Sequence, residues 1–176
     1  AEQGKPLLLA LEEQNQVAMR LDAQGQVSFF EAANGALLTR VALPLPAGVQ
    51  IVSRGLDLPG SNRVVLGLSN GQALVFRHSY KVSYPNNQKT IVPQIEYPFG
   101  ETPIQIDPQG RAIDQIAVSV NGDTLMLAGS TNGQVHALSL TREENLMTGE
   151  VTLDEQRLNL PQLDEPIEKL VIDPRQ

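Results

Sequence analysis

Short apolar runs alternate with turn-forming residues along the whole of this chain. Runs of strand length with a period of two predict β-strands. Three of the turns have nearly the same sequence: "AQGQVSFF" (23–30), "SNGQALVF" (69–76) and "TNGQVHAL" (131–138). Each places a polar residue and Gly-Gln between two apolar runs, which predicts three β-hairpins of one kind.

The geometry of these hairpins depends on their Asn and Gly residues. A type I′ turn needs positive φ at both of its central residues, and Asn-Gly meets this need better than most pairs. We therefore expect positive φ at Asn70 and Gly71, and again at Asn132 and Gly133. We interpret these four residues as structural ones and not as parts of a site.

Further strand-length runs flank each hairpin and extend it to a unit of about four antiparallel strands. A four-stranded unit that recurs along a chain is the signature of β-propeller blades. The predicted fold is therefore all-β and propeller-like with about three blades, and a β-sandwich is the alternative. The flanking runs are "PLLLALEE" (6–13), "ALLTRVAL" (36–43), "VQIVSRGL" (49–56), "TIVPQIEYP" (90–98), "IDQIAVSV" (113–120) and "EVTLDEQRLNL" (150–160).

Two segments bear on the extent of the predicted fold. "SYKVSYPNNQKTIVP" (79–93) predicts a long hairpin that projects from the second unit, with Pro85, Asn86 and Asn87 at its tip. "PIEKLVIDPRQ" (166–176) has the pattern of the first strand of a fourth unit. Because propellers usually close with four to eight blades, we expect residues 1–176 to form one propeller-like domain that is a fragment of a larger one.

Composition and charge exclude several classes of function. The chain has 41% hydrophobic and 19% charged residues, which is typical of a globular protein, and a net charge of −7. Such a charge repels nucleic acid and anionic lipid. The absence of cysteine excludes disulfides and thiolate metal sites. No run approaches the ~20 apolar residues of a membrane span, so we expect any targeting segment or membrane span to lie outside these residues.

The two histidines are the first candidates for chemistry. His78 and His136 follow the second and third Gly-Gln turns at odd offsets, which places both on the same face of their sheets. A metal site would need a third ligand at a matching depth. We interpret both as exposed or half-buried strand residues and predict no metal site.

Other charged and nucleophilic residues form no recognisable catalytic pattern. "GLSNG" (67–71) has the spelling of a nucleophile elbow, but an elbow joins a strand to a helix and this stretch joins two strands. Acidic pairs fall at predicted strand ends or loops, where we expect them to be solvated: Glu12–Glu13, Glu143–Glu144, Asp154–Glu155 and Asp164–Glu165. Arginines are scattered through all three units: Arg20, Arg40, Arg54, Arg63, Arg77, Arg111 and Arg142. We therefore predict that the chain has no catalytic residue, binds no cofactor and is not an enzyme.

Several stretches resemble one known family. These are "KPLLLALEEQNQVAMR" (5–20), "LGLSNGQALVFRHSYKVSYP" (66–85), "LMLAGSTNGQVHALSLTREENLMTGEV" (125–151) and "VIDPRQ" (171–176). They are similar to the large phosphate-type ABC transporter permease of Gram-negative bacteria, in its long PstC-like form. The resemblance covers essentially the whole chain and includes no catalytic motif.

The resemblance implies a place and a set of partners. In that family a soluble, propeller-like region is inserted between the first and second membrane spans of an inner-membrane permease. The region would lie on the periplasmic side, close to the other transporter subunits and the periplasmic phosphate-binding protein. The resemblance therefore implies a non-catalytic interaction module that docks the phosphate-binding protein or another envelope component.

Two further hypotheses stay open. A small-anion sensor that regulates phosphate uptake is one, although a net charge of −7 opposes it unless a local arginine cluster overrides the field. An envelope-assembly scaffold is the other. Independently of function, we expect the fragment to self-associate, because Leu7, Leu9, Leu170 and Ile172 would face water at its two open ends.

Overall fold

The structure, a computed structural model, describes residues 7–57, 60–165 and 167–173, and these contain strands and one short 3₁₀ turn but no α-helix. The strands occur where the sequence alternates between apolar and polar residues. They are β1 (Leu8–Glu12), β2 (Val17–Leu21), β3 (Gln26–Glu31), β4 (Leu37–Ala42), β5 (Ile51–Leu56), β6 (Arg63–Leu68), β7 (Gln72–Ser83), β8 (Thr90–Glu96), β9 (Ile104–Gln105), β10 (Gln115–Asn121), β11 (Thr124–Thr131), β12 (Gln134–Glu144) and β13 (Val151–Asn159).

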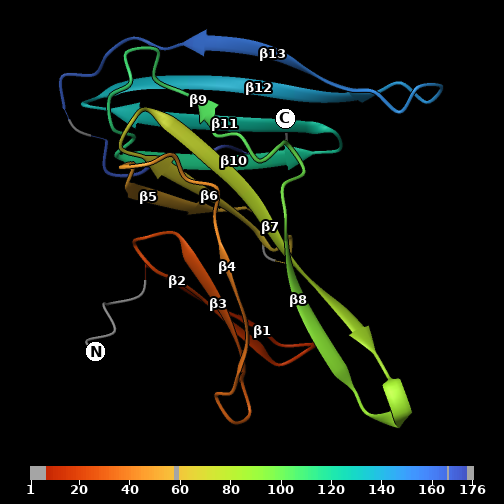
Figure 1. Ribbon diagram of the computed structural model, residues 1–176. Coiled ribbons are helices and arrows are strands. Elements are labelled where there is room, and N and C mark those ends of the chain that lie inside the picture. Colours follow the sequence, from red (N-terminus) through yellow and green to blue (C-terminus); the bar gives the residue numbers. More distant parts are fainter. Residues whose placement is uncertain (1–6, 58–59, 166, 174–176) are drawn as a thin grey trace. The chain divides into compact units, whose positions relative to one another are not determined.

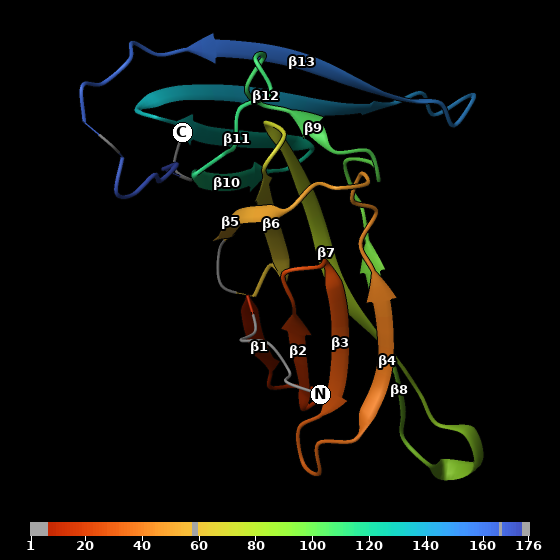
Figure 2. The same ribbon diagram turned by 60° about the vertical axis from the view of Figure 1, so that its left-hand side comes forward.

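The strands form three sheets, each built from strands that follow one another in the chain. Their orders are β1-β2-β3-β4, β5-β6-β7-β8 with β9 also on β7, and β10-β11-β12-β13 (Figures 1 and 2). Three four-stranded antiparallel meanders are the pattern of propeller blades, whereas a sandwich has two sheets joined by Greek-key connections. The predicted all-β, propeller-like class is therefore confirmed; the sheets do not form a closed ring.

The chain divides into two compact units, which are described separately. The first unit comprises Ala1–Ala47 and His78–Glu96, and the second comprises Gly48–Arg77 and Tyr97–Gln176. Strand β7 contributes to both, because its first half belongs to the second unit and its second half to the first.

The first unit contains the sheet β1–β4 and the hairpin of residues 78–96. The predicted long hairpin is confirmed, and its tip is the 3₁₀ turn Pro85–Asn87. It packs against the sheet, because β8 lies beside β4 (Figure 2) and the ring of Tyr80 meets Phe29 edge-on at 6.1 Å between ring centres.

The second unit places β9 against the first half of β7. Ala73 is paired with Ile104 and Gln72 with Gln105, so the outer edge of β7 has β9 at its beginning and β8 further along. The connection between β8 and β10 therefore contains a short strand. This strand leads the chain onto the turn at Gly71.

The core of the second unit lies between its two sheets. Val65 and Val75 of the second sheet and Leu127 and Leu138 of the third belong to one cluster of buried side chains. The two sheets approach closely because Gly67 has no side chain: a Cβ there would lie 2.8 Å from the carbonyl oxygen of Ile113.

The three Gly-Gln turns differ in geometry. At the third turn, Asn132 (φ 48) and Gly133 (φ 81) both have positive φ in a two-residue loop, as predicted. At the second turn, φ is positive at Gly71 (φ 80) but not at Asn70, so the prediction for Asn70 is wrong. The second loop has three residues, and Gly71 N donates to Leu68 O (3.3 Å), which makes Gly71 the left-handed residue that closes a longer turn.

The predicted first strand of a fourth unit is not present within residues 167–173; residues 166 and 174–176 lie outside the described residues. Leu170 and Ile172 are half-buried and, with parts of β5 and β10, line a cavity of about 490 Å³. The apolar pattern therefore reflects packing against β10 without strand pairing. Of the residues expected to face water, Leu9 does so, while Leu7 is half-buried.

Candidate functional site

The most exposed apolar side chains of the described residues lie at the tip of the β12–β13 hairpin. Leu146 is 94% exposed and Met147 is 95% exposed. Large apolar side chains in this position gain nothing for the fold of these residues, because they contact water instead of a core. Paired apolar residues of this kind are typical of protein contact sites.

Hydrogen bonds within the tip order the main chain that carries these two side chains. The Asn145 side chain accepts from Met147 N (2.9 Å) and from Thr148 N (3.2 Å). The Asn145 carbonyl accepts from Gly149 N (2.7 Å), and Asn145 N donates to Glu150 O (2.8 Å). A pre-ordered loop loses less entropy on binding than a flexible one.

Acidic residues surround the apolar tip. Glu143 and Glu144 end β12, Glu150 precedes β13, and all three are exposed. This arrangement disfavours insertion into anionic lipid and favours a protein pocket with an apolar floor and a basic rim. Of these residues, the sequence led us to expect only that Glu143 and Glu144 are solvated; the signal for a site was the adjacent Leu146 and Met147 in a polar stretch.

A second candidate is a cavity of about 480 Å³ in the second unit that three arginines line: Arg63, Arg77 and Arg142. Arg63 and Arg77 are direct cross-strand partners on β6 and β7. Like charges placed opposite each other destabilise a sheet. The pair of arginines is therefore a candidate for a functional role, such as binding an anion. The prediction of scattered arginines is therefore wrong for these three.

The charge in this cavity is largely balanced by neighbouring carboxylates. Arg63 Nη1 lies 2.7 Å from Asp57 Oδ2, and Arg142 Nη2 lies 2.9 Å from Glu144 Oε2. Asp123 lines the same cavity. An anion would have to compete with these groups for the guanidinium donors.

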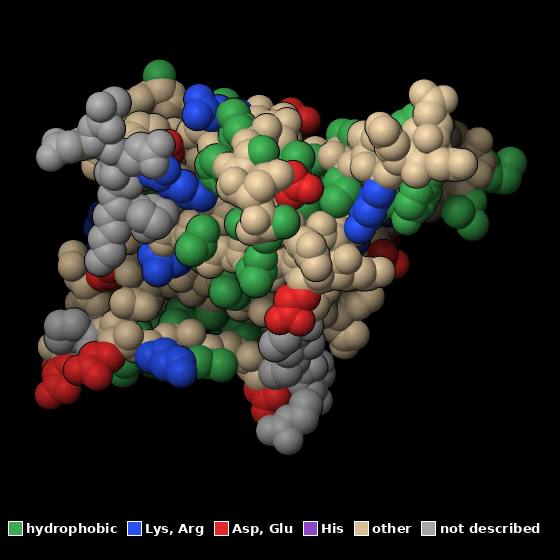
Figure 3. Space-filling model, turned by 90° about the horizontal axis from the view of Figure 1, so that it is seen from below, with side chains coloured by type: hydrophobic (Ala, Val, Ile, Leu, Met, Phe, Trp, Pro, Cys, Tyr) green, Lys and Arg blue, Asp and Glu red, His purple; other side chains and the backbone are tan. Residues whose placement is uncertain are grey.

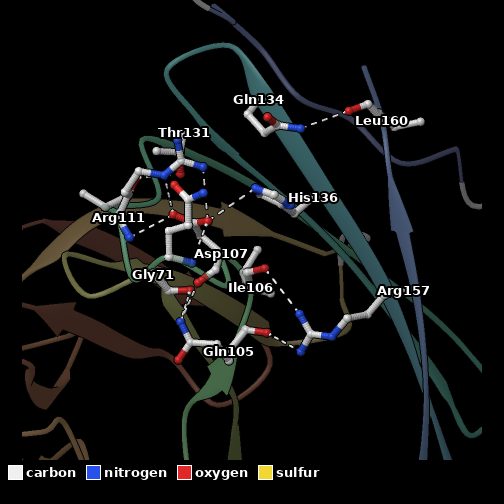
Figure 4. A network of polar contacts seen from close by, with 12 residues as sticks. Gly71, Gln105, Ile106, Asp107, Arg111, Thr131, Gln134, His136, Arg157 and Leu160 are labelled. Carbon is white, nitrogen blue, oxygen red and sulfur yellow. Dashed lines mark hydrogen bonds and ion pairs between the residues drawn. The ribbon is translucent and has the colours of Figure 1, made fainter. Parts of the chain in front are cut away.

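The best-ordered polar centre is the carboxylate of Asp107, which is fully buried (Figure 4). It accepts from Arg111 Nε (2.8 Å), Arg111 N (2.8 Å) and Gln109 N (3.2 Å). His136 Nε2, from the third sheet, lies 3.4 Å from Asp107 Oδ1. Burial would raise the pKa of Asp107, but the hydrogen bonds and charge of Arg111 outweigh it and lower the pKa to about 2.

The Asp107 centre holds the loop 104–113 between the second and third sheets. The main-chain N–H groups of Ile106 and Asp107 donate to Gly71 O (2.9 and 3.0 Å). Arg157 of β13 donates to Gln105 O at 2.8 Å (Figure 4). Because the carboxylate and its main chain are occupied by these contacts, the centre is structural.

The two histidines lie in different units. His78 is buried, which corrects the expectation of an exposed or half-buried residue; His136 is half-buried, as expected. Burial lowers the pKa of His78, and the charge of Glu12 opposes this weakly. Its Nδ1 lies 2.9 Å from the Tyr80 hydroxyl. Among the described residues, no group of three metal-ligating side chains occurs.

The predicted acidic pairs are mostly exposed, and Glu144 lies beside the arginine-lined cavity through its ion pair with Arg142. Asp154 and Glu155 lie within β13 and not at a strand end, which corrects their predicted position. On the face drawn in Figure 3, basic, acidic and apolar side chains are interspersed, so the net charge of −7 does not appear there as one acidic field. Within the described part of the chain, no helix is long and apolar enough to cross a membrane.

No known protein family and no curated protein matches this sequence. Solved structures of propeller and WD40 proteins are similar in strand arrangement. KlHsv2 with loop 6CD replaced by a Gly-Ser linker has a TM-score of 0.49 at 10% identity, over 92% of this chain and 48% of that one. The RRP9 WD40 repeats have a TM-score of 0.43 at 10% identity, over 90% and 39%.

A bacterial structure is also similar. BamB from Moraxella catarrhalis has a TM-score of 0.34 at 15% identity, over 82% of this chain and 50% of that one. The chain thus spans about half the length, or less, of these three proteins. The likeness concerns the fold alone.

Proposed function

We propose that this chain is a non-catalytic protein-interaction module, inserted on the periplasmic side of an inner-membrane phosphate ABC transporter permease. Its partner is the periplasmic phosphate-binding protein or another envelope component. The sequence resemblance over essentially the whole chain supports the transporter context. The pre-ordered Leu146–Met147 tip in its acidic surroundings is the single observation that carries the binding role.

Binding to the purified phosphate-binding protein of the same organism tests this proposal. Biolayer interferometry compares the wild-type chain with a double variant, Leu146→Ser and Met147→Ser. We expect the double variant to bind at least tenfold more weakly, since buried apolar anchors dominate interface energies. Val171→Ser is the matched control, because Val171 is also exposed (69%) but lies outside the tip.

Two results would contradict the proposal. If the wild-type chain does not bind at about 100 µM, which corresponds to a binding free energy of roughly −5.5 kcal/mol, the phosphate-binding protein is not the partner and that half of the proposal is overturned. Equal binding by wild type and tip variant places the contact elsewhere on the chain.

A second candidate function is small-anion sensing, which the Arg63–Arg77–Arg142 cavity favours. Titration calorimetry with inorganic phosphate tests it directly. The carboxylates of Asp57, Glu144 and Asp123 near these arginines lead us to expect no binding at micromolar phosphate. One-site binding that Arg77→Gln abolishes would replace the interaction module with the sensor.

A further inference from the structure

Strand β13 is the outermost strand of the third sheet. It pairs with β12 on one side, and among the described residues no strand pairs with its other side (Figures 1 and 2). Strands β5 and β6 of the second sheet contact β10, the strand at the opposite edge. The side chains of residues 151–158 are all exposed. A long edge strand with open main-chain groups is a template for pairing with another strand.

Two hydrogen bonds at the ends of the β12–β13 hairpin show which main-chain groups of β13 are open. Asn145 N donates to Glu150 O (2.8 Å), and Leu160 N donates to Val135 O (3.4 Å). Opposite residues of an antiparallel pair alternate between those that exchange hydrogen bonds and those that do not. Even-numbered residues of β13 therefore bond to β12, and the odd-numbered residues from 151 to 159 direct their N–H and C=O groups to the open side.

Charged side chains usually protect an edge strand from pairing. On β13, Glu155 and Arg157 have opposite charges and lie two residues apart on one face, where their side chains form an ion pair. Both belong to the residues whose main chain points to the open side. Because both are exposed, their ion pair contributes little to stability, and the two side chains can change partners at small cost.

The spacing of these two charges fits a second copy of the same strand. Two copies of β13 can run antiparallel with Gln156 opposite Gln156 of the copy. Glu155 then lies opposite Arg157 of the copy, in a pair that exchanges two main-chain hydrogen bonds. Opposite charges in such positions stabilise a sheet, and like charges destabilise it. The next register on either side places Glu155 opposite Glu155 or Arg157 opposite Arg157, so the charges favour one register.

We propose that two copies of this chain pair edge to edge through β13, so that their third sheets form one continuous antiparallel sheet. The contact is isologous, and its two-fold axis passes between the two Gln156 side chains. Residues 153–159 of each copy lie in the contact, which involves the third sheet alone. The tip with Leu146 and Met147 lies outside it and stays available to another protein.

Sedimentation velocity between about 1 and 100 µM tests the pairing, because association follows mass action. We expect the wild-type chain to approach twice its mass of 19.1 kDa. Glu155→Arg and Arg157→Glu each place like charges opposite each other, so we expect either variant alone to have a dissociation constant at least about tenfold higher. An equimolar mixture of the two variants should pair as wild type does, because every arginine then lies opposite a glutamate.

Glu168→Arg and Lys169→Glu are the matched controls. They change the net charge by the same amounts at exposed positions outside β13, and we expect both to pair as wild type does. Circular dichroism establishes that each variant is folded. Arg157→Glu also loses the hydrogen bond to Gln105 O, and recovery of pairing in the mixture shows that this loss leaves β13 intact.

A cysteine at the two-fold axis tests the register, since the chain has no cysteine of its own. In Gln156→Cys the two new residues lie directly opposite each other, with about 4.5 Å between their Cα atoms, which suits a disulfide. In Leu158→Cys each new residue lies opposite Asp154 of the copy, and the two cysteines are roughly 13 Å apart along the strand. We expect oxidised glutathione to cross-link Gln156→Cys into a covalent pair and to leave Leu158→Cys as single chains.

Four results would overturn the proposal. A wild-type mass of 19.1 kDa at the highest concentration leaves the edge to a strand of a different protein. A mixture of the charge variants that stays monomeric, equal cross-linking of the two cysteine variants, or a mass that rises beyond two chains also contradicts it. None of these measurements involves phosphate or the phosphate-binding protein, so failure of the pairing is distinct from failure of the proposed function.

Discussion

The turns at Gly71 and Gly133 share the sequence Asn-Gly-Gln, and their surroundings differ. Gly71 O accepts from two main-chain N–H groups, those of Ile106 (2.9 Å) and Asp107 (3.0 Å). Gly133 O accepts from one, that of Leu163 (3.0 Å). In both cases the segment that follows the outer strand returns to the turn of its own sheet.

The difference lies in what each returning segment contributes to the core. Ile106 and Asp107 are fully buried, so the turn at Gly71 is an anchor between two sheets. Leu163 is 53% exposed, and its neighbours Asp164 and Glu165 are exposed as well. The same short sequence therefore has a central role in one place and a peripheral role in the other.

The first turn follows the same rule, since Gly25 O accepts from Leu43 N at 2.9 Å. The repeating unit thus includes the return of the chain onto the glycine carbonyl in addition to the hairpin. Stability of the three turns should depend on the returning segment more than on the turn sequence.

The largest expected effect is that of Gly71→Ala. Positive φ costs an L-residue roughly 1–2 kcal/mol, and the new Cβ would lie 2.8 Å from Gly110 Cα and 3.0 Å from Asp107 O. Because both are main-chain atoms of the loop that the buried Asp107 holds in place, we expect a total loss of about 3 kcal/mol in the free energy of unfolding. Urea denaturation followed by circular dichroism measures it.

Gly133→Ala is the matched comparison. Its Cβ would lie 2.6 Å from Leu163 O, but that segment is exposed and can move. We expect a loss of about 1–2 kcal/mol, mostly from the backbone conformation. If Gly71→Ala and Gly133→Ala lower the free energy of unfolding by the same amount, the surroundings of the two turns do not determine their contribution to stability.

The sequence predicted the hairpins well, for a local reason. Period-2 patterns and Asn-Gly act over a few residues, so strand positions and positive φ at Gly71 and Gly133 could be read directly. The conformation of Asn70 could not be predicted in this way. It depends on the loop having three residues instead of two, and the turn sequence does not set that length.

The candidate sites depend on long-range contacts and were mostly missed. Arg63, Arg77 and Arg142 meet only because β6, β7 and β12 are brought to one cavity. No local pattern around Asp107 indicates that Arg111 and His136 face its carboxylate. The apolar pattern of residues 167–173 was read as a strand because burial and strand pairing have the same local signal.

The second prediction removes the charge at the anchor. Asp107→Asn keeps the size of the side chain but places an amide against the Arg111 guanidinium. Hydrogen bonds to charged groups contribute roughly 1.5–3 kcal/mol, so we expect a loss of about 2 kcal/mol. Adding Arg111→Gln should recover part of this, since the two residues are coupled. Strict additivity in that double-mutant cycle would show that the pair is not coupled.

The third prediction compares two glutamines whose side chains each hold a returning segment at a Gly-Gln turn. Gln105 Nε2 donates to Asp107 O (2.7 Å) at the buried loop, and Gln134 Nε2 donates to Leu160 O (3.1 Å) at an exposed one. We expect Gln105→Ala to cost about 1 kcal/mol and Gln134→Ala less than half of that. Chemical denaturation of the two variants side by side measures the difference, and a larger loss for Gln134→Ala would contradict the ranking of the two turns.

The smallest expected effect is the pH dependence that Asp107 gives to the anchor. Although its burial acts to raise the pKa, the contacts with Arg111 hold the pKa at about 2 in the folded chain, below the 3.8 of a free side chain. Below pH 4 the unfolded chain therefore binds a proton that the folded chain does not, and stability falls as the pH falls toward 2.

Urea midpoints of wild type and Asp107→Asn at pH 5, 4 and 3 isolate this contribution from those of other carboxylates. The difference in urea midpoint between wild type and Asp107→Asn should be constant from pH 7 to 5. It should become smaller from pH 4 downward, because only wild type has a carboxylate at position 107 that becomes protonated. Only part of the titration is reached before the fold is lost to acid, which makes the change small. A gap that stays constant down to pH 3 would mean that Asp107 is not stabilised as a carboxylate, and the anchor at Gly71 would then rest on its main-chain hydrogen bonds alone.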